Sequence, residues 1–442
     1  MSFQQGLSGL SAAAVNLEVI ANNISNASTI GAKSSRAEFS DLYAEAAGGQ
    51  RTTGIGSTLA AVTQDHTQGS ISTTGRNLDL AVNGDGYFQI QVSTQAEGQE
   101  ATKTTLYTRN GQFKTDKDGW IVTNDGARLL GFGADDAGAI RKGQLQELKI
   151  PDARLAQKMT SEITLGFNLD ASDSIRSVND FDQTDGNSFN YSTTTKVFDE
   201  LGQSVEVSTF FKKTAANEWE VYVTANGNNV PPIETGQQPE PIDTITFNST
   251  DGAGPPLKAG ALPADLERAI LTIPAADMMD ALNTDEVDAR GLTFVFGAIR
   301  LNLAGANQQA GDYAISQLSQ DGYGVGTLSG FSFDEQGILT ARYTNGETRS
   351  TAQLAIASFR NPQGLQSVGG NAWQETQAVG TKVIDVPGTG NLGDIVAGAL
   401  EESNVDLTAE LVSLITAQRT YQANAQSIKT QDQVTQTFLT MR

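Results

Sequence analysis

The chain has 442 residues, and its 51 acidic and 29 basic side chains give a formal net charge of −22, which disfavours nucleic-acid binding because an acidic surface repels phosphate backbones. It contains no cysteine, so neither a disulfide framework nor a thiolate metal site can form. The length predicts two to four domains, and 45 glycines predict many short strands joined by turns.

Residues 1–28 carry an apolar stripe at alternating steps of four and three, which predicts a helix that packs lengthwise against other helices. Within this segment, the only charged side chain between Ser2 and Ser28 is Glu18. A solvated helix normally carries charges on its free face, so we expect contact on every side. The stripe consists of Phe3, Leu7, Leu10, Ala14, Leu17, Ala21 and Ile24.

Residues 29–70 mix Gly, Ser and Thr with short apolar pieces and predict an extended connector. This segment contains His66, the only histidine of the chain. With no second histidine and no cysteine to complete a metal pair, the sequence favours a surface or hydrogen-bonded histidine over a ligand or a catalytic base.

From Asn77 onward the pattern changes to alternating apolar residues and tight turns. The turn Asn83–Gly86 precedes a predicted strand, Tyr87–Val92, and further hairpin turns are predicted at Asp118-Gly119 and Asp125-Gly126. This pattern predicts a β-domain that begins near residue 71.

A second β-rich region follows. Thr193–Phe198, Gln203–Lys212 and Glu218–Thr224 predict a meander, and further strands are predicted at Leu271–Ile273 and Leu292–Phe296. Near Gln320 the first pattern returns. We therefore predict an inner β-domain made of residues 71–166 and 321–399, with an outer β-domain, residues 167–320, inserted in it.

Residues 400–442 repeat the helical stripe, interrupted at Gln418. Between Leu411 and Met441 only Arg419, Lys429 and Asp432 are charged. The two terminal segments are therefore predicted to meet in one coiled bundle of helices, and packing between subunits is favoured over a helix core within one domain. The stripe consists of Leu407, Leu411, Leu414, Tyr421, Ala425 and Ile428, and then shifts to Val434, Phe438 and Met441.

Glu401 and Glu402 precede the second helix. A carboxylate pair is typical of acid–base chemistry, but here it is more simply explained as a complement to the dipole of a helix that starts near Ser403. Ser403 and Asp406 have the spacing of a capping box. The predicted fold class is thus mainly β with terminal α-helices, in a nested arrangement that in a tube would place the helices inside and the insertion outside.

Short sequence motifs occur at both ends of the chain and in the first β-region. Residues 22–26 form an Asn-Asn-Ile-x-Asn run, and residues 29–33 form a Thr-x-Gly-x-Lys run. Further motifs are Asn77–Phe88, Tyr107–Phe113, Glu401–Leu407 and Ala417–Asn424. Together they resemble the signatures of bacterial flagellar rod and hook proteins, with Ala32 in place of the usual aromatic residue. The matching signature residues are Asn22, Asn23, Asn26, Gly31, Lys33, Gly84, Gly86, Gln418 and Arg419.

Two pieces of the inserted region separate the hook branch from the rod branch. Lys196–Gly202 and Glu218–Tyr222 resemble the outer domain of hook proteins, which the rod relatives lack. This resemblance implies a self-assembling structural subunit of a curved, flexible tube that joins rod to filament and transmits motor torque. A distal-rod or hook-associated junction protein is the alternative within the same family.

The resemblance also implies partners and a location. The partners are further copies of the chain, the flagellar export apparatus, the hook cap, the distal rod and the hook-filament junction proteins, without nucleic acid or membrane insertion. The location is the extracellular part of the flagellum, reached by type III export. In agreement, the sequence has no basic cluster followed by an apolar run and no stretch of about 18 apolar residues, so neither a cleaved signal nor a spanning helix is predicted.

No enzyme activity, cofactor or metal is expected. Gly322–Gly326 resembles part of a phosphate loop but lacks its lysine, and Asp116–Gly119 resembles part of a calcium loop but has Trp120 where a ligand belongs. A strand entry and a hairpin turn explain these stretches better. A secreted adhesin or hydrolase is a third hypothesis, for which the sequence offers no nucleophile with its base.

Overall fold

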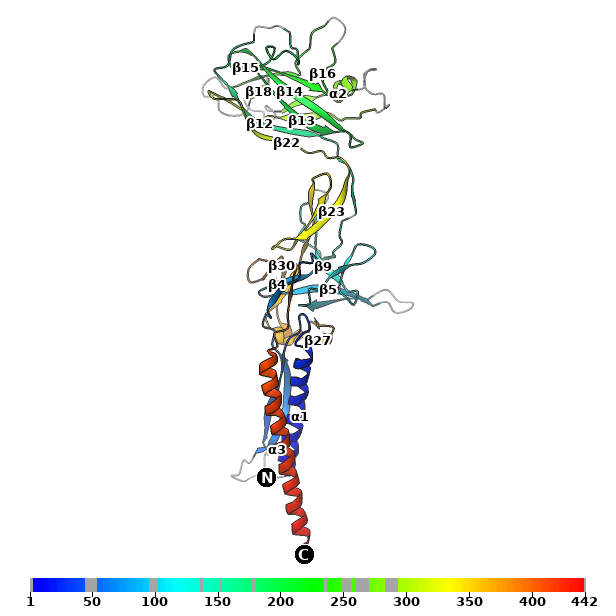
Figure 1. Cartoon of the computed structure of the whole chain (residues 1–442), viewed down its shortest axis with the longest axis vertical. Helices are drawn as coiled ribbons and strands as arrows, with labels where there is room; N and C mark the ends of the chain where they lie inside the picture. The colour runs from blue at the N-terminus through cyan, green and yellow to red at the C-terminus, as the bar shows by residue number, and fades with distance from the viewer. Residues whose placement is uncertain are drawn as a thin grey trace. The chain divides into compact units, whose positions relative to one another are not determined.

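The computed structural model describes residues 3–43, 54–94, 102–135, 138–151, 153–176, 180–233, 237–247, 256–258, 270–282 and 293–440. The chain forms two compact units, drawn in Figure 1. The terminal unit consists of Met1–Asp152, Ser329–Arg342 and Thr348–Arg442, and the inserted unit of Ala153–Leu328 and Tyr343–Glu347. The predicted fold class, mainly β with terminal helices, is confirmed.

Two long helices contain the chain ends in the terminal unit. Helix α1 spans Phe3–Asn26 and helix α3 spans Leu407–Thr440. Asp406 caps α3, because its Oδ1 accepts hydrogen bonds from the backbone N–H groups of Thr408 (2.8 Å) and Ala409 (3.1 Å). The helix therefore begins at Leu407, four residues after the predicted start near Ser403. Within the described residues no helix is long and apolar enough to span a bilayer.

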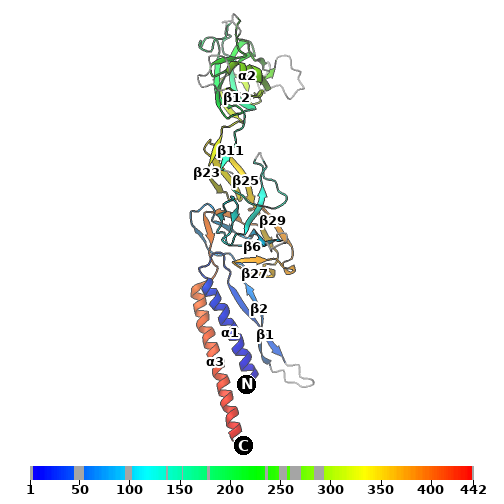
Figure 2. The ribbon, with the colours of Figure 1, turned by 90° about the vertical axis from the view of Figure 1, so that its right-hand side faces the viewer.

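The segment predicted as an extended connector contains an antiparallel hairpin of β1 (Ser35–Tyr43) and β2 (Gly54–Gln64). Pairing the two strands satisfies backbone N–H and C=O groups that a lone extended chain would leave to water. The hairpin lies beside α1, and α3 lies on another side of α1 (Figures 1 and 2). Gly56 permits the approach, since a Cβ there would lie 2.0 Å from Oγ of Ser8.

The β-part of the terminal unit joins two distant stretches of the chain. Strand β4 (Leu80–Asn83) pairs with β30 (Asp394–Ala397), and β3 (Ile71–Thr73) pairs with β31 (Ala399–Glu401). A larger sheet has the order β24-β25-β9-β5-β6-β28-β27. Its strands and their neighbours are β5 (Tyr87–Thr94), β6 (Thr102–Thr108), β7 (Lys114–Thr115), β8 (Ile121–Val122), β9 (Arg128–Gly133), β10 (Gln146–Glu147), β24 (Ile338–Tyr343), β25 (Thr348–Leu354), β26 (Ile356–Phe359), β27 (Gln366–Gly369), β28 (Ala372–Gln374) and β29 (Lys382–Asp385).

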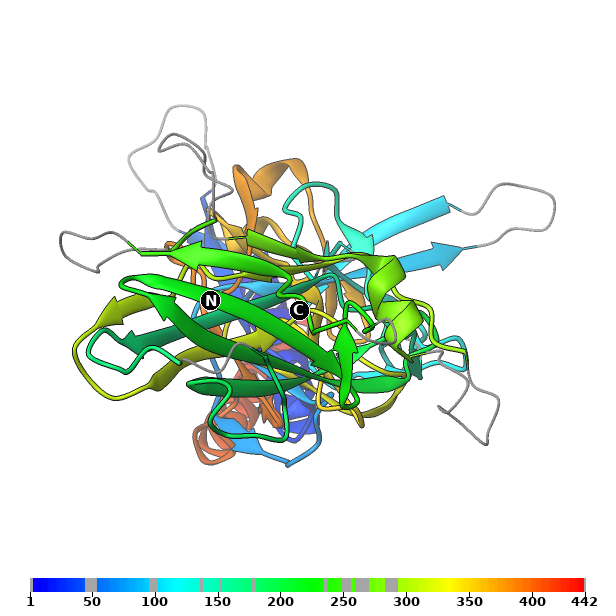
Figure 3. The same ribbon diagram turned by 90° about the horizontal axis from the view of Figure 1, so that it is seen from above.

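The inserted unit is a β-structure around one apolar core, in which Phe167, Phe211 and Trp219 are almost completely buried. One sheet has the order β13-β14-β15-β17-β18 and the other the order β19-β20-β12-β21. Figure 3 shows these strands from above, with helix α2 (Ala275–Leu282) at one edge. The strands of this unit are β11 (Arg154–Leu155), β12 (Glu162–Asp170), β13 (Tyr191–Phe198), β14 (Ser204–Ala215), β15 (Glu218–Ala225), β16 (Asn228–Val230), β17 (Asp243–Thr246), β18 (Leu257–Lys258), β19 (Ile270–Ile273), β20 (Ile299–Asn302), β21 (Asn307–Gln309), β22 (Ala314–Gln320) and β23 (Gly326–Phe333), which continues into the terminal unit.

Two sequence predictions differ from this arrangement. The predicted boundary between residues 166 and 167 falls inside β12, which pairs with β20, β21 and β22, whereas the compact unit extends over Ala153–Leu328. The predicted domain bounds stay a prediction. The strand predicted at Leu292–Phe296 does not form over residues 293–298, and Leu292 lies outside the described residues.

Candidate self-assembly surface

Helices α1 and α3 approach each other closely where α1 has glycine residues. A Cβ added at Gly6 would lie 2.9 Å from Cγ1 of Ile428, and one added at Gly9 would lie 3.1 Å from Nδ2 of Asn424. Ala13 on α1 is buried in the same chain. The intramolecular contact therefore follows a Gly and Ala stripe that lies one residue away from the predicted leucine stripe of α1.

The predicted leucine stripes are only partly covered in the single chain. Leu7 is 52% exposed and Leu411 is 45% exposed. An exposed stripe of this length on two adjacent helices is typical of a surface that packs against another molecule. Exposed members are Leu7, Ala14, Ala21, Leu407, Leu411 and Tyr421, and half-buried members are Leu10, Leu17, Ile24, Leu414, Ala425 and Ile428. The side chains of Phe3 and Phe438, and all of Met441, lie outside the described residues.

The polar residues of α3 satisfy their hydroxyl groups within the helix. The Oγ1 of Thr416 donates to the carbonyl oxygen of Val412 (3.0 Å), and that of Thr435 donates to the carbonyl of Gln431 (2.8 Å). Thr420, Ser427, Thr430 and Thr437 repeat this bond to the residue four before. These hydroxyls are therefore already hydrogen-bonded, so covering them costs little desolvation.

Asn23 ties both helices to the hairpin. Its Nδ2 donates to Oε1 of Glu410 on α3 (2.9 Å) and to the carbonyl oxygen of Ser35 on β1 (2.8 Å), while its Oδ1 accepts from the N–H of Ser35 (2.8 Å). The side chain of Asn23 is buried, and both its Nδ2 and its Oδ1 are hydrogen-bonded, as buried polar atoms in proteins usually are. Asn22 and Asn26 instead bond to each other at the end of α1, with Nδ2 of Asn26 donating to the Asn22 carbonyl (3.0 Å).

A buried ion network joins the segment after α1 to the segment before α3. Glu401 has no exposed side-chain surface and accepts from Nζ of Lys33 (2.6 Å) and Nη1 of Arg109 (2.9 Å). Its Oε1 also accepts from the N–H of Gly69 (3.0 Å). Burial lowers the pKa of the Lys33 ammonium group, and the Glu401 carboxylate opposes that shift.

The predicted role of Glu401 at a helix dipole is therefore wrong, because its carboxylate binds two buried cations and α3 starts at Leu407. Glu402, by contrast, is exposed. Sequence reasoning also missed Arg109 as a partner, although it belongs to one of the quoted motifs. No local pattern contains the pairing, since Lys33 and Glu401 are 368 residues apart.

The signature glycines permit close backbone contacts around this network. Gly31 has φ +69°, and a Cβ there would lie 2.6 Å from the backbone nitrogen of Asn110. Gly84 (φ +115°) accepts a hydrogen bond at its carbonyl from Nη2 of Arg109 (2.8 Å). Gly86 also has a positive φ, +136°. Ala32 is buried, whereas Gln418 and Arg419 are exposed on α3 and belong to a different part of the unit.

His66 lies near this network in a partly buried aromatic setting, as a hydrogen-bonded histidine. Its Nδ1 shares a hydrogen bond of 2.9 Å with the hydroxyl of Tyr87, and its ring contacts that of Trp373 edge-on at a centroid distance of 5.7 Å. Burial lowers the pKa of His66 to about 4, and the nearby charge of Lys33 acts in the same direction.

We expect acid to destabilise the terminal unit through His66. Its folded-state pKa is about 4 against an ordinary 6.5, so the unfolded chain binds the proton more strongly and stability falls as pH decreases from about 6.5 to 4. After allowance for solvent screening, the loss is about 2 kcal/mol. Urea unfolding of the full chain at pH 7.5 and pH 4.5, compared with His66→Gln, measures it. An equal pH dependence of both proteins would contradict this prediction.

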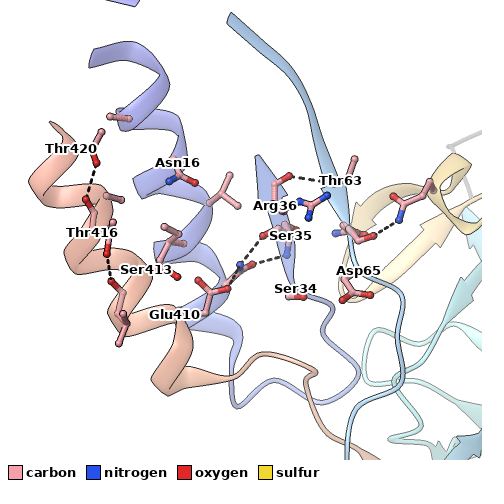
Figure 4. Close-up of a pocket in the computed structure, with 18 residues that line it drawn as sticks. Asn16, Ser34, Ser35, Arg36, Thr63, Asp65, Glu410, Ser413, Thr416 and Thr420 are labelled. Atoms are coloured by element: carbon pink, nitrogen blue, oxygen red, sulfur yellow. Dashed lines mark hydrogen bonds between the residues drawn. The ribbon is translucent and has the colours of Figure 1, made fainter. Parts of the chain in front are cut away.

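A groove of about 690 Å³ lies between α1, α3 and the hairpin. Figure 4 shows Thr416 and Thr420 of α3 on one side, Asn16 of α1 in the middle, and Arg36 and Thr63 of the hairpin on the other side. The apolar part of the lining comes from Ala13, Val19, Ile20, Val412 and Ala417. A groove of this kind, open and without a convergent set of catalytic groups, suits a side of a helix better than a small substrate.

Models of four protein families match consecutive parts of the chain. They are the flagella basal body rod protein model (residues 3–33), the flagellar hook protein FlgE/F/G D1 domain (81–166), the flagellar basal body protein FlaE D2 domain (168–323) and the flagellar basal body rod FlgEFG protein C-terminal model (396–441). Rod-type ends and a hook-type interior thus occur in one chain.

Relatives that match over their whole length distinguish the hook proteins from the other flagellar axial proteins. The chain is 35% identical over 446 residues to the flagellar hook protein FlgE of Escherichia coli K12 and 34% identical over 444 residues to that of Salmonella typhimurium LT2, with 100% of both chains covered in each case. Among solved structures, the Helicobacter pylori flagellar hook protein FlgE2 shares the fold, with a TM-score of 0.52 and 15% identity over 75% of this chain and all of that one. The chain belongs to the flagellar hook protein family.

Proposed function

We propose that the chain is a structural subunit of the bacterial flagellar hook that polymerises through α1 and α3. The observation that carries this assignment is the pair of partly exposed apolar stripes on the two terminal helices, in a chain that matches hook proteins over its whole length. The distal-rod alternative is not favoured, because the FlaE D2 domain model matches residues 168–323.

The polymer would be a short curved tube that acts as a universal joint between rod and filament. A bend that stays fixed in space while the tube rotates requires each row of subunits to lengthen and shorten once per revolution. Permanent contacts along the helices combined with shallow polar contacts elsewhere meet this requirement, since no deep apolar interlock then has to be broken.

The proposal also includes the assembly partners of the chain and its route of export. Assembly would take place under a hook cap after type III export, between the distal rod and the hook-filament junction proteins, outside the cell. A passage through a narrow export channel requires an unfolded or loosely folded chain. The absence of cysteine from the sequence supports this route, because no disulfide has to form or break on the way.

Electron microscopy of the purified chain tests the function. The full-length protein, driven toward assembly with salt at high concentration, should form curved tubes in negative stain. Straight tubes would favour the rod-type alternative. Monomers under all conditions, including after addition of preformed tube fragments as seeds, would contradict self-assembly as the function of this chain.

A further inference from the structure

The last turns of α3 extend past the start of α1. Ile428 lies opposite Gly6 and Asn424 opposite Gly9, so the two helices run in opposite directions. Since α1 begins at Phe3, the segment 432–440 of α3, here called the overhang, continues beyond the first described residue of α1. Figures 1 and 2 both show α3 protruding past α1 at this end.

The described side chains of the overhang are accessible in the single chain. Residues 432–437 are all exposed, and Val434 is 42% exposed. Asp432 is its only charged residue, and the hydroxyls of Thr435 and Thr437 bond within the helix. A segment of about nine residues rich in threonine is marginal as an isolated helix in water. A helix with this surface is therefore expected to be stabilised by packing against another surface.

The groove beside α1 and α3 has matching size and chemistry. One turn of helix with side chains, about 10–12 Å across and 5.4 Å high, occupies roughly 400–600 Å³. The groove measures about 690 Å³, and its floor includes the buried side chains of Ile20 and Ala417. Its walls are mainly small and uncharged, with Arg36, Asp65 and Glu410 as the charged lining residues. Both surfaces thus combine apolar side chains with uncharged polar ones and carry few charges, three in the groove and one, Asp432, in the overhang.

We propose that the overhang of one copy docks into the groove of a second copy displaced along the helix axis. This inference rests on the proposed function and specifies the contact by which it is carried out. Val434 follows Ala417 by seventeen residues, which is about 26 Å along one helix. A copy shifted by this distance brings its Val434 to the level of Ala417 and its Lys429 within one turn of Glu410.

The overhang cannot reach the groove of its own chain, because both belong to one continuous helix. The contact joins two different surfaces, so each copy offers a free overhang at one end and a free groove at the other. Such a heterologous contact repeats without closing and generates an open helical polymer. It also sets the axial step between the two copies that it joins.

Engineered cysteines test this contact cleanly, because the chain has none of its own. The test variant carries Val434→Cys and Thr416→Cys, the second in the groove lining. These positions are 18 residues, or about 27 Å, apart on one helix, whereas a disulfide needs a Cα separation of about 4.4–6.8 Å. Any disulfide is therefore intermolecular. The variant is polymerised under reducing conditions, oxidised, and analysed by denaturing electrophoresis without reductant.

The matched control carries Val434→Cys and Gln418→Cys. Gln418 is exposed at nearly the same height of α3 but lies outside the groove, about 200° around the helix from Thr416. The groove pair should give a ladder of dimers, trimers and longer species, with at least tenfold less cross-linking in the control pair.

Three results would overturn the inference. A ladder in the control but not in the groove pair would place the overhang on another face. Dimers without longer species would indicate a closed two-fold contact. Curved tubes of the groove pair that yield no cross-links would show that another contact sets the axial step, while leaving the proposed function intact. By contrast, an unmodified chain that never polymerises would contradict the function itself.

Discussion

Replacing Glu401 by glutamine is expected to lower the stability of the terminal unit by about 3 kcal/mol. The substitution keeps the shape of the side chain but leaves Lys33 and Arg109 as buried cations without a counter-charge. Removing one partner of a buried ion pair typically costs about 3–5 kcal/mol. The lower end applies here, because burial already lowers the pKa of Lys33, which can lose its proton in response.

Hydrogen exchange in the full chain measures this effect locally. Backbone protection in β4 and β31 should fall by about a hundredfold, since 1.4 kcal/mol corresponds to a factor of ten. Protection in β14 and β15 of the inserted unit should not change, which provides an internal control. Glu402→Gln, at the exposed neighbouring position, is the matched control variant. Equal protection in Glu401→Gln and Glu402→Gln would disprove the structural role of the network.

The network has a mechanical implication for a torque-bearing subunit. Lys33 follows α1 and Glu401 precedes α3, while Arg109 belongs to the β-part of the terminal unit. Asn23 makes a second connection, from α1 to both the hairpin and α3. The two helices are therefore fixed to their own β-part by buried, multiply bonded groups. Force applied to the helices would reach that β-part without passing through exposed salt bridges.

The existence of the terminal helices could be predicted from the sequence, because a period of 3.6 residues depends only on neighbouring positions. Which stripe of α1 meets α3 could not. Leu7 and Gly6 both belong to plausible stripes, and the leucine stripe has the stronger apolar pattern. Close approach in fact occurs at Gly6 and Gly9, where the absence of a side chain is the determining property. Hydrophobic periodicity does not register that property.

Some of the site residues could be predicted from the sequence, whereas their partners could not. The signature motifs drew attention to Lys33, Gly31 and Asn23, all of which the structure places at contacts between elements. Their partners were not predictable, since Arg109 and Glu401 are 292 residues apart and meet only in the folded chain. The packing role of the leucine stripes stays a prediction, because a single chain does not show whether a second copy covers their exposed members.

Replacing Leu411 by aspartate is expected to abolish assembly at concentrations where the unmodified chain polymerises. Leu411 is 45% exposed in the single chain, so the substitution should change the free energy of unfolding by no more than about 0.5 kcal/mol. In the polymer the same position is predicted to be covered. An unpaired buried charge then costs several kcal/mol per subunit.

The effect appears in the critical concentration for polymerisation, measured by sedimentation of tubes at increasing protein concentration. A cost of about 3 kcal/mol corresponds to an increase of more than a hundredfold. Leu201→Asp is the matched control, because Leu201 is 61% exposed in the inserted unit and receives the same new charge. Leu411→Met should polymerise normally, since methionine keeps the apolar volume. If Leu411→Asp and Leu201→Asp had equal critical concentrations, the leucine stripe of α3 would not be a subunit contact, and only a contact elsewhere on the helices, such as the groove, would remain.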